Sequence, residues 1–104
     1  MDRFAALAEP NRRRIVELLG AGPLPAGALA AHFALSAPAV SQHLKTLREA
    51  GLVRVEVDGQ RRIYSLDVEG LAEVEAWLVR ARGFWGGRLD ALEAALKQEK
   101  GEKE

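Results

Sequence analysis

The fold is decided by the stretch from Leu35 to Gly51, which reads LSAPAVSQHLKTLREAG. In this stretch Val40, Leu44 and Leu47 are spaced i, i+4 and i+7, which is typical of the buried face of an α-helix. The face roughly opposite comprises Pro38, Ser41, Gln42, Lys45 and Glu49. The pattern therefore predicts an amphipathic helix over residues 37–50.

Both ends of this helix carry residues that suit helix caps. Ser36 is a good N-cap, and Pro38 lies in the first turn, where no intrahelical N–H is needed. Gly51 suits the C-terminal cap because glycine accepts the left-handed conformation found there.

After Gly51 the period of the apolar residues changes from 3.6 to 2, which predicts strands. Valines at 53, 55 and 57 alternate with charged residues, and Asp58-Gly59 is a strong hairpin-turn signal. A second strand is expected over residues 60–66. If Asp58 and Gly59 form a two-residue turn, Glu56 faces Arg61 across the ladder.

Apolar residues and helix-start signals around this region predict further helices over residues 2–8, 10–19 and 26–33, and another beginning after Asp67, which would cap it. Glycines at 83, 86 and 87 weaken this last helix, so we expect a kink or a break near them. Beyond Gly83 an apolar seam follows the heptad-like spacing 4, 3, 4 and comprises Trp85, Leu89, Leu92 and Leu96.

The order of these elements predicts a fold that is mainly α with a small β-hairpin, namely a winged helix-turn-helix. In this fold one helix presents its polar face to the major groove of DNA, and the hairpin offers basic groups to nearby phosphates. We expect one DNA-binding and dimerisation domain over residues 1–98 and a charged tail over residues 99–104 that frays.

The composition excludes several classes of protein. The 104 residues contain no cysteine, which rules out a disulfide framework, a thiolate metal site and a cysteine nucleophile. His32 and His43 are eleven residues apart and cannot build a four-ligand zinc site in one chain. No Ser/His/Asp set or phosphate loop is present. We therefore predict no catalytic residue, no metal site and no cofactor.

The charges are balanced overall but not along the chain. Residues 1–66 hold nine Lys/Arg and six Asp/Glu, whereas residues 67–104 hold six and nine. A basic N-terminal half suits a nucleic-acid partner. Residues 18–44 carry no charge, but repeated Pro and Gly predict compact short helices there rather than a membrane span. The first residues lack an apolar signal-peptide core, so a cytoplasmic location is expected.

Three segments resemble the arsenic-repressor (ArsR) family of regulators. They are residues 7–15 (LAEPNRRRI), residues 35–53 and residues 59–66 (GQRRIYSL), and the resemblance extends over about residues 4–96. The segment from Phe84 to Leu96 is similar to a subgroup of small repressors without metal sites. Pro25 stands where the family usually has a Ser or Thr cap.

The residues expected to contact double-stranded DNA are Arg12, Ser36, Ala37, Pro38, Ser41, Gln42, His43, Lys45, Arg61 and Arg62. Gln42 can pair with adenine edges and Lys45 with guanine or phosphate. Backbone N–H groups at the helix N-terminus favour phosphate. Two alternatives stay open: His43 could be half-packed against the core, and Arg12 could form an intramolecular ion pair instead.

An apolar set is expected to form a homodimer interface and comprises Phe4, Leu7, Trp77, Trp85, Leu89, Leu92 and Leu96. The alternative is that the aromatic and leucine seam closes the core of a monomer. A domain of this size leaves few surfaces to cover once the helix-turn-helix is closed, so a dimer is the better interpretation.

The sequence thus predicts a homodimeric repressor that binds a palindromic operator through residues 37–50 and the hairpin over residues 53–66. As the resemblance implies, it would repress by occupying a promoter. Two alternatives remain: a winged-helix module that binds a protein instead of DNA, and a metal-responsive member of the same family. The sequence does not identify an effector.

Overall fold

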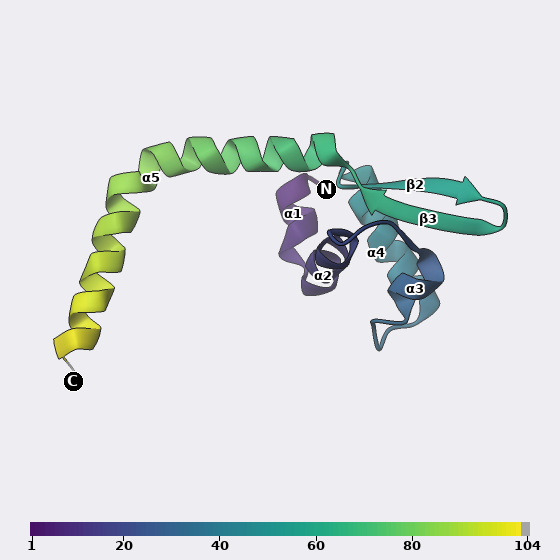
Figure 1. The fold of residues 1–104 in the computed structure, drawn as a ribbon, viewed down its shortest axis with the longest axis horizontal. Helices are drawn as coiled ribbons and strands as arrows, with labels where there is room; N and C mark the ends of the chain where they lie inside the picture. Colours follow the sequence, from purple (N-terminus) through teal and green to yellow (C-terminus); the bar gives the residue numbers. More distant parts are fainter. Residues whose placement is uncertain (103–104) are drawn as a thin grey trace. The chain divides into compact units, whose positions relative to one another are not determined.

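The computed structural model describes the backbone of residues 1–102 and the side chains of residues 1–98 except that of Leu89. The chain is mostly helical with one antiparallel sheet (Figure 1). Its elements are α1 (Arg3–Ala8), α2 (Pro10–Leu19), β1 (Leu24–Pro25), α3 (Ala26–Ala30), α4 (Ala37–Glu49), β2 (Val53–Asp58), β3 (Arg61–Leu66) and α5 (Val68–Glu102). They divide into two compact units, Met1–Val74 and a second unit that begins at Glu75.

Helix α4 has the caps that the sequence predicts. The Ser36 hydroxyl accepts a hydrogen bond from the Ala39 N–H at 3.2 Å. At the other end Gly51 has a φ of +75°, its N–H donates to the Arg48 carbonyl, and the Leu52 N–H donates to the Leu47 carbonyl at 2.9 Å. These two bonds form a Schellman motif, which ends the helix cleanly.

The core of the first unit is built around the apolar face of α4. Val40, Leu44 and Leu47 are all buried, with Leu47 fully inaccessible to solvent. The other buried core side chains are Ala6, Ile15, Leu19, Leu29, Ala50, Leu52, Val53 and Tyr64. Burying one face of α4 in this way leaves its opposite face available to a partner.

The uncharged stretch of residues 18–44 is divided among α2, β1, α3 and α4. In the part of the chain that the structure describes, no helix combines the length and the apolar character needed to cross a membrane.

The sheet has the strand order β1-β3-β2 and is antiparallel throughout. Figure 1 shows the hairpin of β2 and β3 projecting beyond the helices of the first unit. Strand β1 was not predicted and pairs Leu24 with Tyr64. A signal for it exists, because Pro25 restricts the residue before it to an extended conformation.

The predicted hairpin register is wrong by two residues. The turn residues are Gly59 and Gln60, so Asp58 pairs with Arg61 and Glu56 pairs with Ile63. Gly59 has a φ of +63° at the first turn position, where a type II′ turn requires a positive φ. A shift of two residues keeps every side chain on its predicted face, so only the cross-strand partners change.

The third helix is shorter than predicted. The expected helix over residues 26–33 ends at Ala30, and only single-turn hydrogen bonds continue it, from the His32 N–H to the Leu29 carbonyl and from Phe33 to Ala30. Pro25 at its N-cap offers no side-chain hydrogen bond. A helix of five residues without a cap gains little from its own hydrogen bonds, so packing of Leu29 in the core holds it.

Helix α5 starts where Asp67 was predicted to cap it, with the Gly70 N–H donating to the Asp67 carboxylate at 3.2 Å. This first turn packs against the end of α4 so closely that a Cβ on Gly70 would overlap the Gly51 carbonyl oxygen. Arg3 of α1 forms an ion pair with Glu73 beside this contact. Three helices of the first unit therefore meet at one point.

The sequence predicted a kink or a break in the last helix; the break is absent, whereas Figure 1 shows α5 changing direction in its light-green part. Helix α5 continues through Gly83, Gly86 and Gly87 as one element. The tail expected to fray at residues 99–104 lies largely outside the described residues: the backbone of residues 99–102 belongs to α5, and nothing further is described there.

Candidate nucleic-acid interface

The outward face of α4 carries the polar side chains that the sequence singled out. Ser41, Gln42 and Lys45 are exposed, as are Ser36, Ala37 and Pro38 at the helix N-terminus. Because Val40, Leu44 and Leu47 anchor the opposite face in the core, the helix holds this surface rigidly toward solvent.

A groove runs between α4 and strand β3, with a volume of about 400 Å³. Its lining includes Ser41, Gln42, Lys45 and Arg48 from α4 and Arg62 and Tyr64 from β3. The structure thus brings the predicted recognition helix and the predicted wing together at one concave surface. A surface that combines hydrogen-bonding side chains with cations suits a nucleic acid.

The two wing arginines lie on opposite faces of β3. Arg62 and Tyr64 are two residues apart, so they point to the same side, and both line the groove. Arg61 points to the other side and pairs in register with Asp58. Arg62 is opposite Val57, so no carboxylate faces it across the ladder. Of the two, Arg62 is therefore the one placed beside α4.

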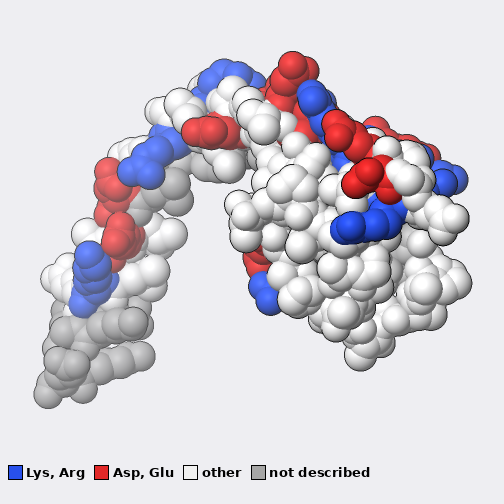
Figure 2. Space-filling view, turned by 45° about the vertical axis from the view of Figure 1, so that its right-hand side comes forward, with Lys and Arg blue, Asp and Glu red and all other residues white. Residues whose placement is uncertain are grey.

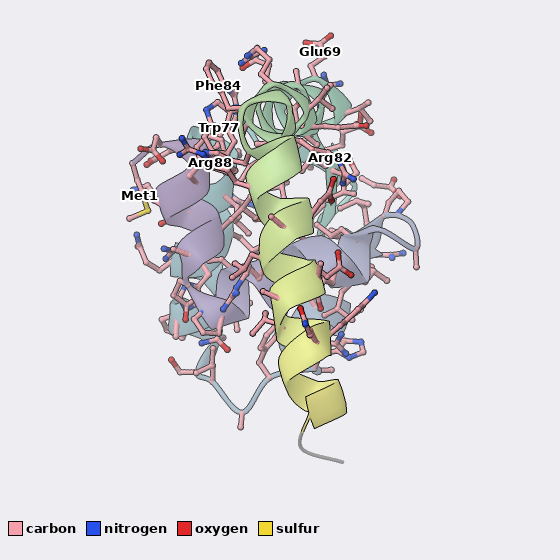
Figure 3. All side chains as sticks on the ribbon, turned by 90° about the vertical axis from the view of Figure 1, so that its left-hand side faces the viewer. Met1, Glu69, Trp77, Arg82, Phe84 and Arg88 are labelled. Atoms are coloured by element: carbon pink, nitrogen blue, oxygen red, sulfur yellow. The ribbon has the colours of Figure 1, made fainter. Side chains whose placement is uncertain are left out.

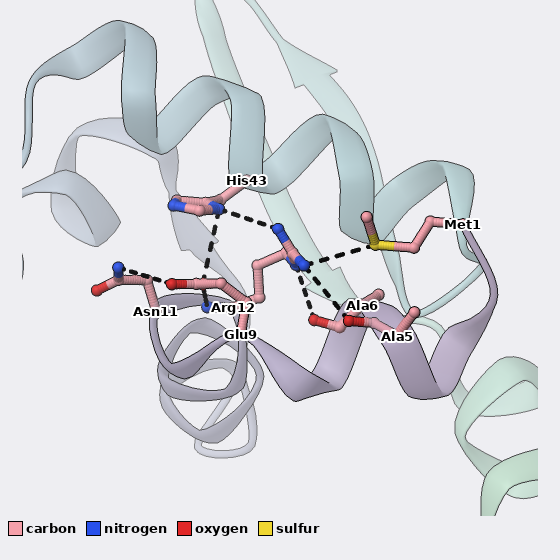
Figure 4. Close-up of polar contacts among 7 residues, drawn as sticks. All are labelled: Met1, Ala5, Ala6, Glu9, Asn11, Arg12 and His43. Carbon is pink, nitrogen blue, oxygen red and sulfur yellow. Dashed lines mark hydrogen bonds and ion pairs between the residues drawn. The ribbon is translucent and has the colours of Figure 1, made fainter.

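Arg12 is half-buried, and its guanidinium is held against α1 and α4 by polar contacts (Figure 4). Its Nε donates to the Ala6 carbonyl at 2.7 Å and its Nη2 to the Ala5 carbonyl at 3.4 Å. Its Nη1 lies 3.5 Å from His43 Nδ1. The guanidinium thus caps the C-terminal end of α1, where helix carbonyls lack partners. These contacts are hydrogen bonds to carbonyl oxygens rather than the ion pair that the sequence offered as the alternative for Arg12.

His43 is half-buried against the junction of α1 and α2 (Figure 4). Its Nδ1 lies 3.7 Å from a carboxylate oxygen of Glu9, which also accepts hydrogen bonds from the Arg12 N–H and the Asn11 side chain. Burial raises the pKa of Glu9, but the backbone N–H groups of Arg12 and Asn11 and the nearby His43 outweigh it, so the pKa lies below its ordinary value. This cluster ties α4 to the N-terminal helices.

The side chains predicted to form a dimer interface fall in both units. Phe4 and Leu7 belong to α1, where Leu7 packs against the core and Phe4 is exposed. In the second unit Trp77 and Trp85 form an edge-to-face pair with ring centroids 6.1 Å apart. Leu92 and Leu96 are more than half exposed, and the side chain of Leu89 lies outside the described residues.

The exposed side chains of α5 surround the helix. Figure 3 shows Trp77, Phe84 and Arg88 on one side of α5 and Arg82 on the other. On the face drawn in Figure 2, Lys/Arg and Asp/Glu are interspersed along the second unit rather than gathered by sign. The notable feature of this unit is thus its exposed apolar surface.

Among the described residues, no three His, Cys, Asp or Glu side chains are grouped closely enough to hold a metal ion.

Sequence reasoning missed Arg48 and Tyr64 as lining residues of the groove. Helical spacing offered a signal for Arg48, since it follows Lys45 by three residues and shares its side of α4. Strand alternation with Arg62 offered one for Tyr64.

Comparison with known proteins places this geometry among transcriptional regulators. A domain family described as "Helix-turn-helix domain" matches residues 7–56. The HTH-type transcriptional regulator Rv2034 of Mycobacterium tuberculosis is 51% identical over 82 residues, which cover 79% of this chain and 74% of that protein. The transcriptional repressor SdpR of Bacillus subtilis is 37% identical over 73% of this chain and 84% of its own length.

Two solved structures share the fold. A "possible transcriptional regulator for arsenical resistance" superimposes with a TM-score of 0.78 and 47% identity, covering 90% of this chain and 95% of that one. The ArsR family transcriptional regulator RHA00566 superimposes with a TM-score of 0.74 and 32% identity, covering 80% and 91%.

Proposed function

The chain belongs to the ArsR family of winged helix-turn-helix transcriptional regulators, and we propose that it is a homodimeric repressor of a palindromic operator. Its relatives are regulators rather than enzymes, and so is this chain. Side chains of α4 would contact the base edges of the operator, and the hairpin of β2 and β3 would contact its phosphates. Because DNA is its partner, we place the protein in the cytoplasm.

The observation that carries this proposal is the groove between α4 and β3. Gln42 and Ser41 offer hydrogen-bonding groups to base edges, and Lys45 and Arg62 on the same surface offer charges to phosphates. The capped N-terminus of α4 adds backbone N–H groups that favour a phosphate, beside Ser36, Ala37 and Pro38. Arg61 would reach phosphates on the other side of the wing. We leave Arg12 out of the contact set because its guanidinium caps α1.

The proposed dimer rests on the apolar side chains of α1 and α5. Trp85, Leu92 and Leu96 are spaced along one side of α5 and are about half exposed or more. A two-fold axis would let this surface cover its counterpart on a second copy. Two recognition helices would then enter successive major grooves, so half-sites should lie about 34 Å apart.

Selection of bound sequences from random duplex DNA tests the proposal. Enrichment of an inverted repeat with half-sites one helical turn apart is the expected result. A gel shift across a salt titration should then show affinity for this sequence falling steeply as salt rises. If no duplex is enriched and a protein partner is retained instead, the chain is a winged-helix interaction module and the proposal fails.

A further inference from the structure

Three cations, Lys45, Arg48 and Arg62, line the groove between α4 and β3. Among the described residues, no hydrogen bond or ion pair reaches the side chains of Lys45, Arg48 or Arg62. Four basic residues outside the groove are engaged: Arg3 pairs with Glu73, Arg14 with Glu17 and Arg54 with Asp67, and Arg12 donates to α1 carbonyls. Arg13 and Arg61 are exposed and stand apart from the groove. The groove is thus a place where positive charge is left uncompensated.

No carboxylate among the described residues lines this groove. Like charges at close range repel one another, so gathering three cations in a concavity costs free energy until an anion enters. The helix dipole alone could explain the position of Arg48, because it favours a cation in the last turn of α4. The dipole does not explain why Arg62, from a strand distant in sequence, lines the same groove.

The groove joins two elements that the fold holds rigidly. Leu44 and Leu47 anchor α4 beneath Lys45 and Arg48, and the Schellman motif ends the helix directly after them. Tyr64, buried on β3 beside Arg62, pairs with both Val55 and Leu24 across the sheet. Since both walls are fixed, the backbones that carry the three cations are positioned in advance, and an anion would have to order only their side chains.

From these observations we propose that Arg48 and Arg62, with Lys45, form a phosphate clamp that holds one backbone phosphate of the duplex between α4 and the wing. This inference rests on the proposed function and adds Arg48 to it. The clamp makes no base contact, so it contributes the same affinity to every sequence. Base reading is left to Ser41 and Gln42, which lie nearer the N-terminus of α4.

The first test compares Arg48→Ala with wild type on the selected operator and on random duplex. Arg48→Ala should weaken binding to both by about tenfold and reduce the slope of log affinity against log salt by about one per protomer. Arg48→Lys keeps the charge and should recover most of the affinity. Arg54→Ala removes an arginine that is already paired with Asp67 outside the groove, so it should leave the slope nearly unchanged.

The second test locates the phosphate. Each backbone phosphate of a half-site is replaced in turn by a neutral methylphosphonate. At one position the neutral linkage should weaken DNA binding by wild type. The same linkage should have no further effect on DNA binding by Arg48→Ala or Arg62→Ala, because the variant and the linkage remove the same contact. Circular dichroism and thermal melting establish that the variants are folded.

A free anion is the other source of the same chemistry. Competition by inorganic phosphate or pyrophosphate at constant ionic strength, with no methylphosphonate position silenced by Arg48→Ala, would overturn the assignment to DNA. Unchanged affinity and salt slope in Arg48→Ala would also overturn it. If Gln42→Ala still alters base preference in that case, the proposed function survives and only the clamp fails. If wild type binds no duplex, the proposed function itself has failed.

Discussion

At the scale of single residues, the proposed interface assigns different roles to neighbouring side chains of one groove. Gln42 and Arg62 both line the surface between α4 and β3, but an amide side chain can match the donor and acceptor pattern of adenine, whereas an isolated guanidinium facing phosphates reads only charge. The difference lies in the chemistry of the two side chains rather than in their positions. It should therefore appear when the affinity of each variant is compared between different DNA sequences.

We predict that Gln42→Ala relaxes base preference and costs about 1–3 kcal/mol on the best operator, with little loss on random duplex. Arg62→Ala should instead weaken all sequences similarly and flatten the salt dependence. Gel shifts on both kinds of DNA measure the two effects. Equal losses on operator and random duplex in Gln42→Ala would remove this residue from base reading.

Gly70 is needed because the backbone of α5 lies very close to the Gly51 carbonyl at this position. A methyl group there would collide with the Gly51 carbonyl, whereas a methyl group on Gly83, in the same helix, would meet nothing within 4 Å beyond the nearby backbone of its own helix among the described residues. We predict that Gly70→Ala lowers the free energy of unfolding by about 1–3 kcal/mol through overpacking. The matched variant Gly83→Ala should raise it by about 0.5–1 kcal/mol through helix propensity. Urea unfolding of both variants measures these changes. An unchanged free energy of unfolding in Gly70→Ala would show that α5 can shift away from α4.

At the scale of elements, the helices depend on polar contacts at their ends. Ser36 caps α4, Asp67 caps α5, and Arg12 covers the last carbonyls of α1. The Gly70 N–H holds the pKa of Asp67 below its ordinary value of 3.8, and Arg54, 3.6 Å away, lowers it as well. The ionised form of Asp67 is therefore favoured in the folded protein.

A lowered pKa stabilises the fold at any pH above the unfolded value and loses this contribution as pH falls through the folded value. We predict that wild type is more stable than Asp67→Asn near neutral pH, that the difference begins to shrink near pH 3.8, and that it is lost as pH falls through the lower folded pKa of Asp67. Asparagine can still accept the capping hydrogen bond, so the comparison isolates the charge. Urea midpoints of both proteins between neutral and acid pH measure it. A difference that is independent of pH would show that the charge of Asp67 does not stabilise α5.

At the scale of the whole molecule, the proposed dimer decides how DNA is bound. Trp85, Leu92 and Leu96 leave apolar surface exposed on α5. Contiguous apolar surface of this kind is typical of an interface. The spacing of two recognition helices, and hence the length of the operator, would follow from this contact.

We predict that Leu92→Asp dissociates the dimer, because an unpaired charge is costly in an apolar contact. Affinity for a full palindrome should fall toward that of a half-site. Ala94→Asp places the same charge on the opposite side of α5 and should leave the dimer intact. Sedimentation of the three chains is the direct measurement. A wild-type monomer of 11.3 kDa at micromolar concentration would contradict the interface.

We also predict that zinc, cadmium and arsenite leave operator affinity unchanged at micromolar concentration. The chain has no cysteine, and no group of three ligands is found among the described side chains. Operator binding in the presence of each metal, with and without a chelator, provides the test. A tenfold change that the chelator reverses would indicate a site assembled between subunits.

Local sequence determined the elements and their faces. The spacing of Val40, Leu44 and Leu47, the Ser36 cap and Gly51 predicted α4 to within one residue at its C-terminal end. The alternation from Val53 onward predicted the hairpin and put each of its side chains on the correct face. These features depend on neighbours three or four residues away in a helix, or two away in a strand, so they can be read from the chain itself.

Only the tertiary structure decided which distant residues meet. The Gly59-Gln60 turn, the β1 strand against Tyr64 and the capture of Arg12 by α1 carbonyls all escaped local patterns. So did the helical continuity through Gly83, where local propensity left a kink and a break as alternatives. The groove is also decided by the tertiary structure, because Arg48 and Arg62 line one surface only after α4 has packed beside β3. Local spacing cannot encode such contacts, because they depend on how the core packs. They also depend on which buried polar atoms still need a hydrogen-bond partner after the chain has folded.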